Sequence, residues 1–147
     1  MNLFQKTDVE IVYADIDMVD STNTEKVIRK WKSGNYTRES FKWGWMPPHP
    51  TLFVKKEVYD KFGVFNLQFN TSADYELMLR FLYKYNVKAA YLPRVIIKMR
   101  TGGYSGSSLF HRIYANKEDK LAWEINNLKP YFFTTWLKPL RKIIQYL

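Results

Sequence analysis

The alternation of apolar and polar positions divides the first part of the chain into short strands joined by turns. Residues 9–19 are rich in β-branched and aromatic side chains and lack a helical stripe, which predicts a strand. The turn-forming residues 20–24 separate it from a second short strand that begins at Lys26, and the pair predicts a hairpin. Residues 33–50 are predicted as a loop and residues 52–54 as a third, very short strand.

Helical patterns dominate the rest of the chain. Residues 56–62 predict a short helix closed by Gly63, and residues 87–100 predict a strand pair or one bent strand with a kink at Pro93. Between them lies the clearest helix, which Thr71 or Ser72 can cap and which Asn86 ends; its apolar stripe consists of Leu77, Met78, Phe81, Leu82 and Tyr85. Next comes a flexible loop over residues 101–108, whose last serines can cap the following helix. That helix is predicted over about residues 109–128, and a final segment covers residues 130–147. This order predicts an α/β fold with too few strands for a complete doubly wound sheet, similar to the latter part of one.

Length and composition exclude several classes of protein. A chain of 147 residues with 46% hydrophobic and 25% charged residues is long enough for one domain with a buried core and is not disordered. The absence of cysteine excludes a disulfide framework, a thiolate metal site and a cysteine nucleophile. No apolar run is long enough to span a bilayer, and the first residues lack a secretory pattern, so we expect a cytoplasmic protein.

Charge and aromatic content point toward phosphate-bearing partners. Aromatic residues make up 18% of the chain. Residues 1–25 hold six acids and one base, whereas the remaining residues hold 22 bases and eight acids, so the net charge of +9 is the sum of −5 and +14. A basic body attracts nucleic acid, lipid headgroups or nucleotide-linked substrates, and composition alone does not choose among them.

Several short segments carry candidate chemistry. The two carboxylates of Asp15 and Asp17 can bind a divalent cation or can form a solvated strand edge. His49, in a stiff proline-rich segment, is a pocket residue or simply stacks among its aromatic neighbours. Asp74 and Glu76, at the start of the clearest helix, compensate the helix dipole or hold a general base.

Two further segments suit anionic surroundings. The stretch from Arg100 to Ser105 joins a cation to a glycine-rich loop, which suits a phosphate or is a plain turn. Residues 130–147 interleave bases (Lys138, Arg141, Lys142) with aromatic and aliphatic residues and contain no acid. This pattern predicts an amphipathic helix on an anionic membrane surface, with docking against another domain as the alternative.

Taken in order, these segments resemble a known family. The sequence is similar to the C-terminal half of bacterial family 2 glycosyltransferases of the GT-A fold, which build cell-surface polysaccharides, and the resemblance covers about residues 1–110. The segments that carry it are Tyr13-Ala-Asp15, Trp43-Gly-Trp-Met-Pro-Pro-His-Pro-Thr-Leu-Phe-Val54, Phe62-Gly-Val-Phe, Ser72-Ala-Asp-Tyr-Glu76, Leu79-Arg80 and Met99-Arg-Thr-Gly-Gly-Tyr-Ser105.

The resemblance implies a reaction and a set of roles. Such enzymes transfer a sugar from a nucleotide-diphosphate donor to an acceptor hydroxyl with inversion, using a divalent cation (Mg or Mn) and one carboxylate base. The base position matches Asp74, and the substrate-binding positions match His49, Glu76, Arg80 and Trp45. The loop that closes over the donor diphosphate matches Arg100, Gly102, Gly103 and Ser105.

The sequence also departs from the family. The nucleotide-binding half and its Asn-Ala-Asp-Asp type of metal motif are not in this sequence, so Asp15 and Asp17 are interpreted as a decoy and no metal ligand is assigned. The fold is therefore expected to be a partial GT-A fold followed by amphipathic helices. We expect a fragment, a misassigned start or a truncated gene product that binds nucleotide sugars poorly and turns over little.

The resulting hypothesis has two parts along the chain. Residues 1–108 form the acceptor-side and catalytic-base half of a glycosyltransferase domain that uses a glycan or lipid-linked acceptor. Residues 109–147 form a helical extension that attaches the protein to the inner face of the cytoplasmic membrane. The first alternative is a noncatalytic membrane-surface or interaction module. The second is a nucleic-acid-binding module, which the basic body with its aromatic residues suggests. The bases are scattered and no nucleic-acid-binding motif is present, and both observations argue against this second alternative.

Overall fold

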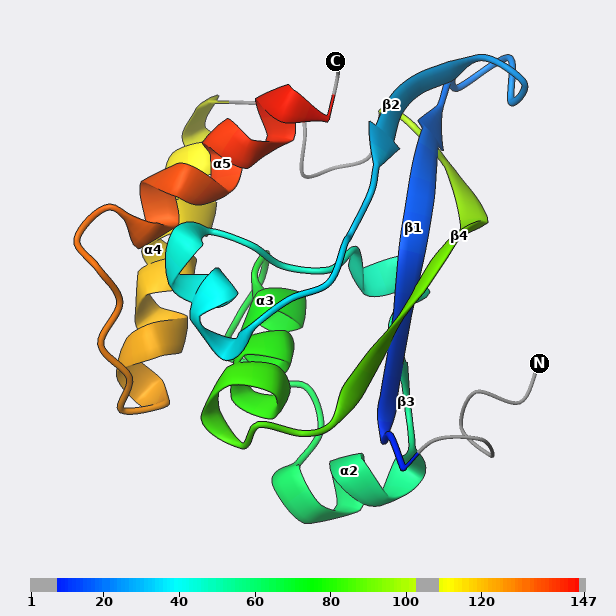
Figure 1. The fold of residues 1–147 in the computed structure, drawn as a ribbon. Coiled ribbons are helices and arrows are strands. Elements are labelled where there is room, and N and C mark those ends of the chain that lie inside the picture. Colours follow the sequence, from blue (N-terminus) through cyan, green and yellow to red (C-terminus); the bar gives the residue numbers. More distant parts are fainter. Residues whose placement is uncertain (1–7, 103–108, 146–147) are drawn as a thin grey trace.

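The computed structural model describes residues 8–102 and 109–145, which form a mixed α/β structure. Figure 1 shows α3 (Ala73–Met78), α4 (Leu109–Ile125) and α5 (Thr134–Ile144) together on one side of the sheet. The α/β class predicted from the sequence is therefore confirmed.

The sheet is built around β1 (Ile11–Val19), which is its central strand. Along one edge β1 pairs antiparallel with β2 (Val27–Trp31) and with β3 (Phe53–Val54), and along the other it pairs in parallel with β4 (Ala89–Arg100). The predicted hairpin and the predicted short third strand are both confirmed. Because β1 is flanked on both edges and buried for most of its length, its two aspartates do not lie on a solvated strand edge.

Strand β4 is one continuous strand whose register against β1 slips twice. Leu92 pairs with Ala14, but the next partners are Val95 with Asp15 and Ile97 with Ile16. The first slip falls at Pro93, which cannot donate a ladder hydrogen bond. The sequence-based choice between two strands and one bent strand is settled in favour of one.

The segment predicted as a loop over residues 33–50 contains two short 3₁₀ helices. These are η1 (Arg38–Trp43) and η2 (His49–Thr51). Gly44 ends η1 with a φ of +73°, and a Cβ atom there would lie 2.6 Å from the backbone nitrogen of Lys138. Glycine is therefore what allows α5 to approach this turn so closely.

Two of the predicted helices are confirmed with small differences. Helix α2 (Lys56–Phe62) ends at Gly63 as expected. Helix α3 passes directly into a π-helical turn, η3 (Leu79–Lys84), and four members of the predicted apolar stripe, Leu77, Met78, Phe81 and Leu82, are buried on this continuous helical segment, whereas Tyr85 is exposed at its end. The expected capping serines before α4 lie outside the described residues.

Ser72 takes the N-cap position of α3, as expected, but its side chain makes no capping hydrogen bond, and the start of the helix is instead held from a distance by α4. The Glu118 carboxylate of α4 accepts hydrogen bonds from the backbone N–H groups of Asn70 (2.8 Å), Thr71 (2.8 Å) and Ser72 (2.9 Å) and from the Thr71 hydroxyl (2.7 Å). A carboxylate satisfies several donors at once and interacts favourably with the helix dipole, which a serine hydroxyl does less well. Helix α4 also contributes the buried Trp123 to the same core as α3.

Candidate functional site

Asp74, the residue that the resemblance matches to the catalytic base, lies in the first turn of α3 and is half-buried. Its Oδ1 accepts a hydrogen bond from the backbone N–H of Tyr75 at 2.8 Å. No cationic side chain among the described residues pairs with this carboxylate. A carboxylate that is held at a helix start but not neutralised by an ion pair can accept a proton.

Glu76 and Arg80, one helical turn apart, form a buried pair. The Glu76 side chain is only 2% exposed, and its two oxygens accept from Arg80 Nε (2.9 Å) and Nη2 (3.1 Å). Asn126 of α4 also donates to Glu76 (3.0 Å). The Glu76 carboxylate is thus occupied inside the protein, and its matched role in substrate binding stays a prediction.

Arg80 connects α3 to the turn that follows α2. Its guanidinium donates to the carbonyl oxygen of Phe62 through Nη1 and to that of Val64 through Nη2 (2.7 Å). The next residue in this turn, Phe65, packs edge-on against the His49 ring with a centroid distance of 5.6 Å. One chain of contacts therefore leads from the helix that carries Asp74 to His49.

His49 is placed by η2, which is fastened to the central strand. The Thr51 hydroxyl donates to the Ala14 carbonyl (2.9 Å) and accepts from the Ala14 N–H (3.2 Å). It thus takes the hydrogen-bonding position that the backbone of a neighbouring strand would otherwise occupy. The imidazole of His49 is half-buried and has no hydrogen-bond partner within residues 8–102 and 109–145. Its ring nitrogens are therefore free to meet a hydroxyl group.

Trp45 is fixed within a cluster of aromatic rings. Its ring stacks on Tyr36 (4.8 Å, 4°) and its Nε1 donates to the Ser33 carbonyl (2.9 Å). Tyr13 and Phe41 pack edge-on against it. Burial raises the pKa of Tyr36 to about 12.

The segment matched to the donor loop lies at another end of the sheet. Arg100 pairs with Val19, whereas η2 contacts Ala14, and five residues of strand correspond to about 17 Å. Gly102 has a φ of +103° and nothing near the position of a Cβ. Gly103 and Ser105 lie outside the described residues.

Asp15 and Asp17 do not form a metal site. Asp15 is buried, and its Oδ1 accepts from the Ser33 N–H (2.8 Å) and the Tyr91 hydroxyl (2.7 Å). The described residues contain no group of three or more acidic or histidine side chains arranged to hold a metal ion. The residues present therefore do not fit the divalent cation that the resemblance implies. Asp17 Oδ1 is buried and receives no hydrogen bond from a described residue.

Sequence reasoning missed a second ion pair beneath α3. Lys138, assigned from the sequence to the membrane-facing tail, instead points into the protein: its Nζ lies 2.8 Å from both oxygens of Asp119 and 3.9 Å from the centroid of the Tyr75 ring. Burial raises the pKa of Tyr75, whose hydroxyl accepts from Trp123 Nε1 (2.9 Å). No local pattern marks this pair, because its members lie on different helices.

No family model, no curated protein and no solved structure matches this chain.

Proposed function

We propose that this chain supplies the acceptor side and the catalytic base of an inverting glycosyltransferase that uses a nucleotide-diphosphate sugar. The observation that carries the proposal is the contact chain from α3 to His49. It joins the Glu76–Arg80 pair, which follows Asp74 on the same helical segment, to the Phe62–Phe65 turn and the matched acceptor-side histidine. The helical residues 72–80 and the segment that carries His49, both part of the resemblance, are thus linked in space through the Phe62–Phe65 turn.

The proposed step is a direct displacement at the anomeric carbon. An acceptor hydroxyl held near His49 loses its proton to the Asp74 carboxylate as its oxygen attacks the donor sugar, and the nucleotide diphosphate leaves with the bonding electron pair. Attack opposite to the leaving group inverts the anomeric configuration.

Glu76 and Arg80 act in this proposal as positioning residues. A bidentate pair with low exposure keeps the guanidinium in one orientation, and that orientation holds the turn that carries Phe65. The packing of Phe65 then limits the His49 ring to one orientation.

The test is release of nucleoside diphosphate from a panel of nucleotide sugars, with and without glycan acceptors. We expect weak acceptor-dependent release with the 147-residue chain, and a loss of about 100-fold or more in Asp74→Asn, because removal of a general base costs about that much. Asp60→Asn is the matched control, since Asp60 is an exposed carboxylate on α2.

Two outcomes count against the proposal. Equal release by the wild type and Asp74→Asn would remove the base assignment. Absence of acceptor-dependent release together with absence of saturation-transfer NMR signals from every acceptor in the panel would remove the acceptor site as well.

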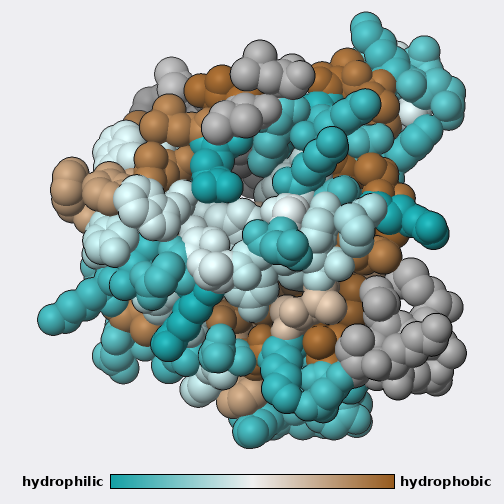
Figure 2. Space-filling view, in the orientation of Figure 1, coloured by the Kyte–Doolittle hydropathy of each residue, from teal (hydrophilic) through white to brown (hydrophobic). Residues whose placement is uncertain are grey.

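We also propose that α5 holds the protein on an anionic membrane surface, at the inner face of the cytoplasmic membrane. Three large apolar side chains on one face of α5 are exposed, Trp136 (62%), Leu140 (55%) and Ile143 (61%), and Phe132 in the turn just before the helix is 91% exposed. Figure 2 shows hydrophobic side chains gathered along the upper edge of the molecule, where α5 lies in Figure 1. The chain has no acidic residue after Glu124, which favours contact with anionic lipid. None of the described helices is long and apolar enough to cross a bilayer.

Vesicle sedimentation tests this attachment. The double variant Trp136→Ser/Leu140→Ser is expected to bind phosphatidylserine-containing vesicles about 10- to 100-fold more weakly than the wild type, because each lost apolar contact contributes roughly 1–2 kcal/mol. Leu67→Ser is the control, since Leu67 is 92% exposed in a loop outside α5. Removal of residues 130–147 is also expected to release the protein from the vesicles. Thr134 and Thr135 of this segment are buried, so the truncation also disturbs folding, and the point variants are needed to test attachment alone. Equal binding of the double variant and the control would contradict the assignment.

A further inference from the structure

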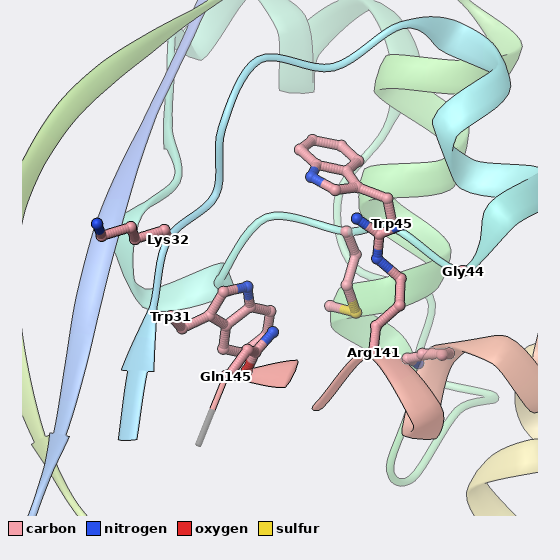
Figure 3. Close-up of a pocket in the computed structure, with 8 residues that line it drawn as sticks. Trp31, Lys32, Gly44, Trp45, Arg141 and Gln145 are labelled. Carbon is pink, nitrogen blue, oxygen red and sulfur yellow. The ribbon is translucent and has the colours of Figure 1, made fainter. Parts of the chain in front are cut away.

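A cavity of about 120 Å³ lies between the end of β2, the turn after η1 and the inner face of α5. Figure 3 shows Arg141 extending from α5 toward Trp45, and Gln145 lying beside the Trp31 indole. The cavity shares only Trp45 with the residues matched to the glycosyltransferase site. The lining residues used below are Trp31, Lys32, Trp45, Lys138, Arg141 and Gln145.

The walls of this cavity are fixed by contacts outside it. Trp45 is held by its hydrogen bond to the Ser33 carbonyl and by the Tyr36 ring. Lys138 is held by the Asp119 carboxylate, and Gly44 leaves no room for a side chain between the turn and α5. A cavity with such walls needs little rearrangement to accept a ligand.

The charge of the lining favours an anion. Three basic residues line the cavity and no acidic residue does. Asp119 neutralises Lys138, which leaves Lys32 and Arg141, neither of which pairs with an acid within the described part of the chain. A guanidinium binds phosphate through two parallel hydrogen bonds, so Arg141 is the better anchor of the two.

One buried acceptor defines a second feature of the ligand. Gln145 Oε1 is buried and receives no hydrogen bond from a described residue. A buried acceptor without a donor is unfavourable, so a hydroxyl group that donates to it is stabilised. The neighbouring Trp31 indole offers a flat face of the kind that packs against the C–H groups of a sugar ring.

We propose that this cavity binds the phosphate ester of a polyhydroxylated compound. The phosphate lies against Arg141, and an adjacent hydroxyl donates to Gln145 Oε1; Figure 3 shows the Lys32 side chain extending away from Arg141, so Lys32 contributes positive charge at the rim and no direct contact. Such a group occurs in soluble sugar phosphates and in the headgroup of phosphatidylinositol. Lys138, Arg141 and Gln145 lie on the face of α5 opposite to Trp136, Leu140 and Ile143, which places the cavity away from the proposed membrane contact and favours the soluble source.

The test is isothermal titration calorimetry of the full chain with glucose 1-phosphate, inorganic phosphate, glucose and phosphatidylinositol vesicles. We expect glucose 1-phosphate to bind with a Kd of about 0.1–1 mM, glucose not to bind, and inorganic phosphate to bind several-fold more weakly than the ester. Saturable binding of the vesicles by the wild type, lost in Arg141→Gln but kept in Trp136→Ser/Leu140→Ser, would assign the cavity to the lipid headgroup instead of the soluble ester.

Two variants separate the two contacts. Arg141→Gln is expected to weaken binding of both the ester and inorganic phosphate about tenfold or more, because it removes a charge-assisted contact. Gln145→Met is expected to weaken binding of the ester about three- to tenfold and to leave inorganic phosphate unchanged. Lys56→Gln, an exposed lysine at the start of α2, is the control for net charge, and circular dichroism checks that each variant is folded. Absence of saturable binding of glucose 1-phosphate or of phosphatidylinositol vesicles to the folded wild type, or equal affinity in Arg141→Gln and Lys56→Gln, overturns the proposal.

Discussion

The long-range cap of α3 by Glu118 gives a sharp prediction about stability. The Glu118 side chain is 5% exposed and accepts four hydrogen bonds from the segment Asn70–Ser72. In Glu118→Gln the amide oxygen still accepts, but the amide NH₂ group faces backbone N–H donors. At least one backbone donor then loses its acceptor, and the favourable interaction between the negative charge and the helix dipole disappears.

The size of the effect follows from these losses. A buried donor left without a partner costs about 1–3 kcal/mol. The charge at the helix start contributes about 0.5–1 kcal/mol more. We therefore expect Glu118→Gln to lower the free energy of unfolding by about 2–4 kcal/mol at pH 7, measured by urea unfolding followed by circular dichroism.

The difference in the free energy of unfolding between the wild type and Glu118→Gln should also depend on pH. Burial acts to raise the pKa of Glu118, but the backbone N–H groups of Asn70, Thr71 and Ser72 and the Thr71 hydroxyl outweigh it, and the pKa is lowered below its usual 4.5. Because the pKa of the folded state is the lower one, the stabilisation is fully present above about pH 4.5 and is lost as the pH falls through the folded-state pKa. The difference between wild type and Glu118→Gln should therefore shrink at pH 3.

Glu124→Gln on the exposed face of α4 is the matched control and should unfold within about 0.5 kcal/mol of the wild type. If Glu118→Gln behaves like Glu124→Gln at pH 7, or if its deficit is the same at pH 3 and pH 7, the carboxylate does not stabilise the start of α3 and the reasoning is refuted.

Two further predictions concern close contacts in the fold. Gly44→Ala should lower the free energy of unfolding by about 2–4 kcal/mol, because a Cβ atom would meet the Lys138 backbone nitrogen at 2.6 Å. Gly34 also has a positive φ (+66°) but open space around it, so Gly34→Ala should lower the free energy of unfolding by only about 1 kcal/mol. Equal urea midpoints of the two variants would argue against the close approach of α5 to Gly44. Arg80→Lys keeps the charge but loses the bidentate contact to Glu76 and should cost about 2–4 kcal/mol, and an unchanged urea midpoint would show that this pair does not secure α3.

Sequence reasoning succeeded where the determining interactions are local. The β-branched run of β1 and the glycine after α2 identify their elements because backbone propensity and side-chain burial agree there. The same is true of the amphipathic pattern of α5, whose apolar face is exposed.

The failures at the start of α3 and in α5 involve partners distant in sequence. The cap of α3 comes from Glu118, and Lys138 turns inward because Asp119 and Tyr75 lie beneath α5. Neither contact leaves a local signature. The candidate site shows the same division, since the motif positions could be named from the sequence, but the link through Arg80 and Phe65 to His49 requires the fold.

The slipped register of β4 also bears on how the protein behaves when concentrated. A long edge strand with an unbroken row of backbone donors and acceptors is a template for unwanted pairing with other molecules and for growth of insoluble aggregates. Pro93 and the two slips break that row in the middle of the strand, where Pro93, Arg94 and Val95 are exposed. The irregularity therefore opposes self-association, and a change that restored regular alternation there would favour precipitation and would also shift the pairing of β4 with β1 beyond the slip.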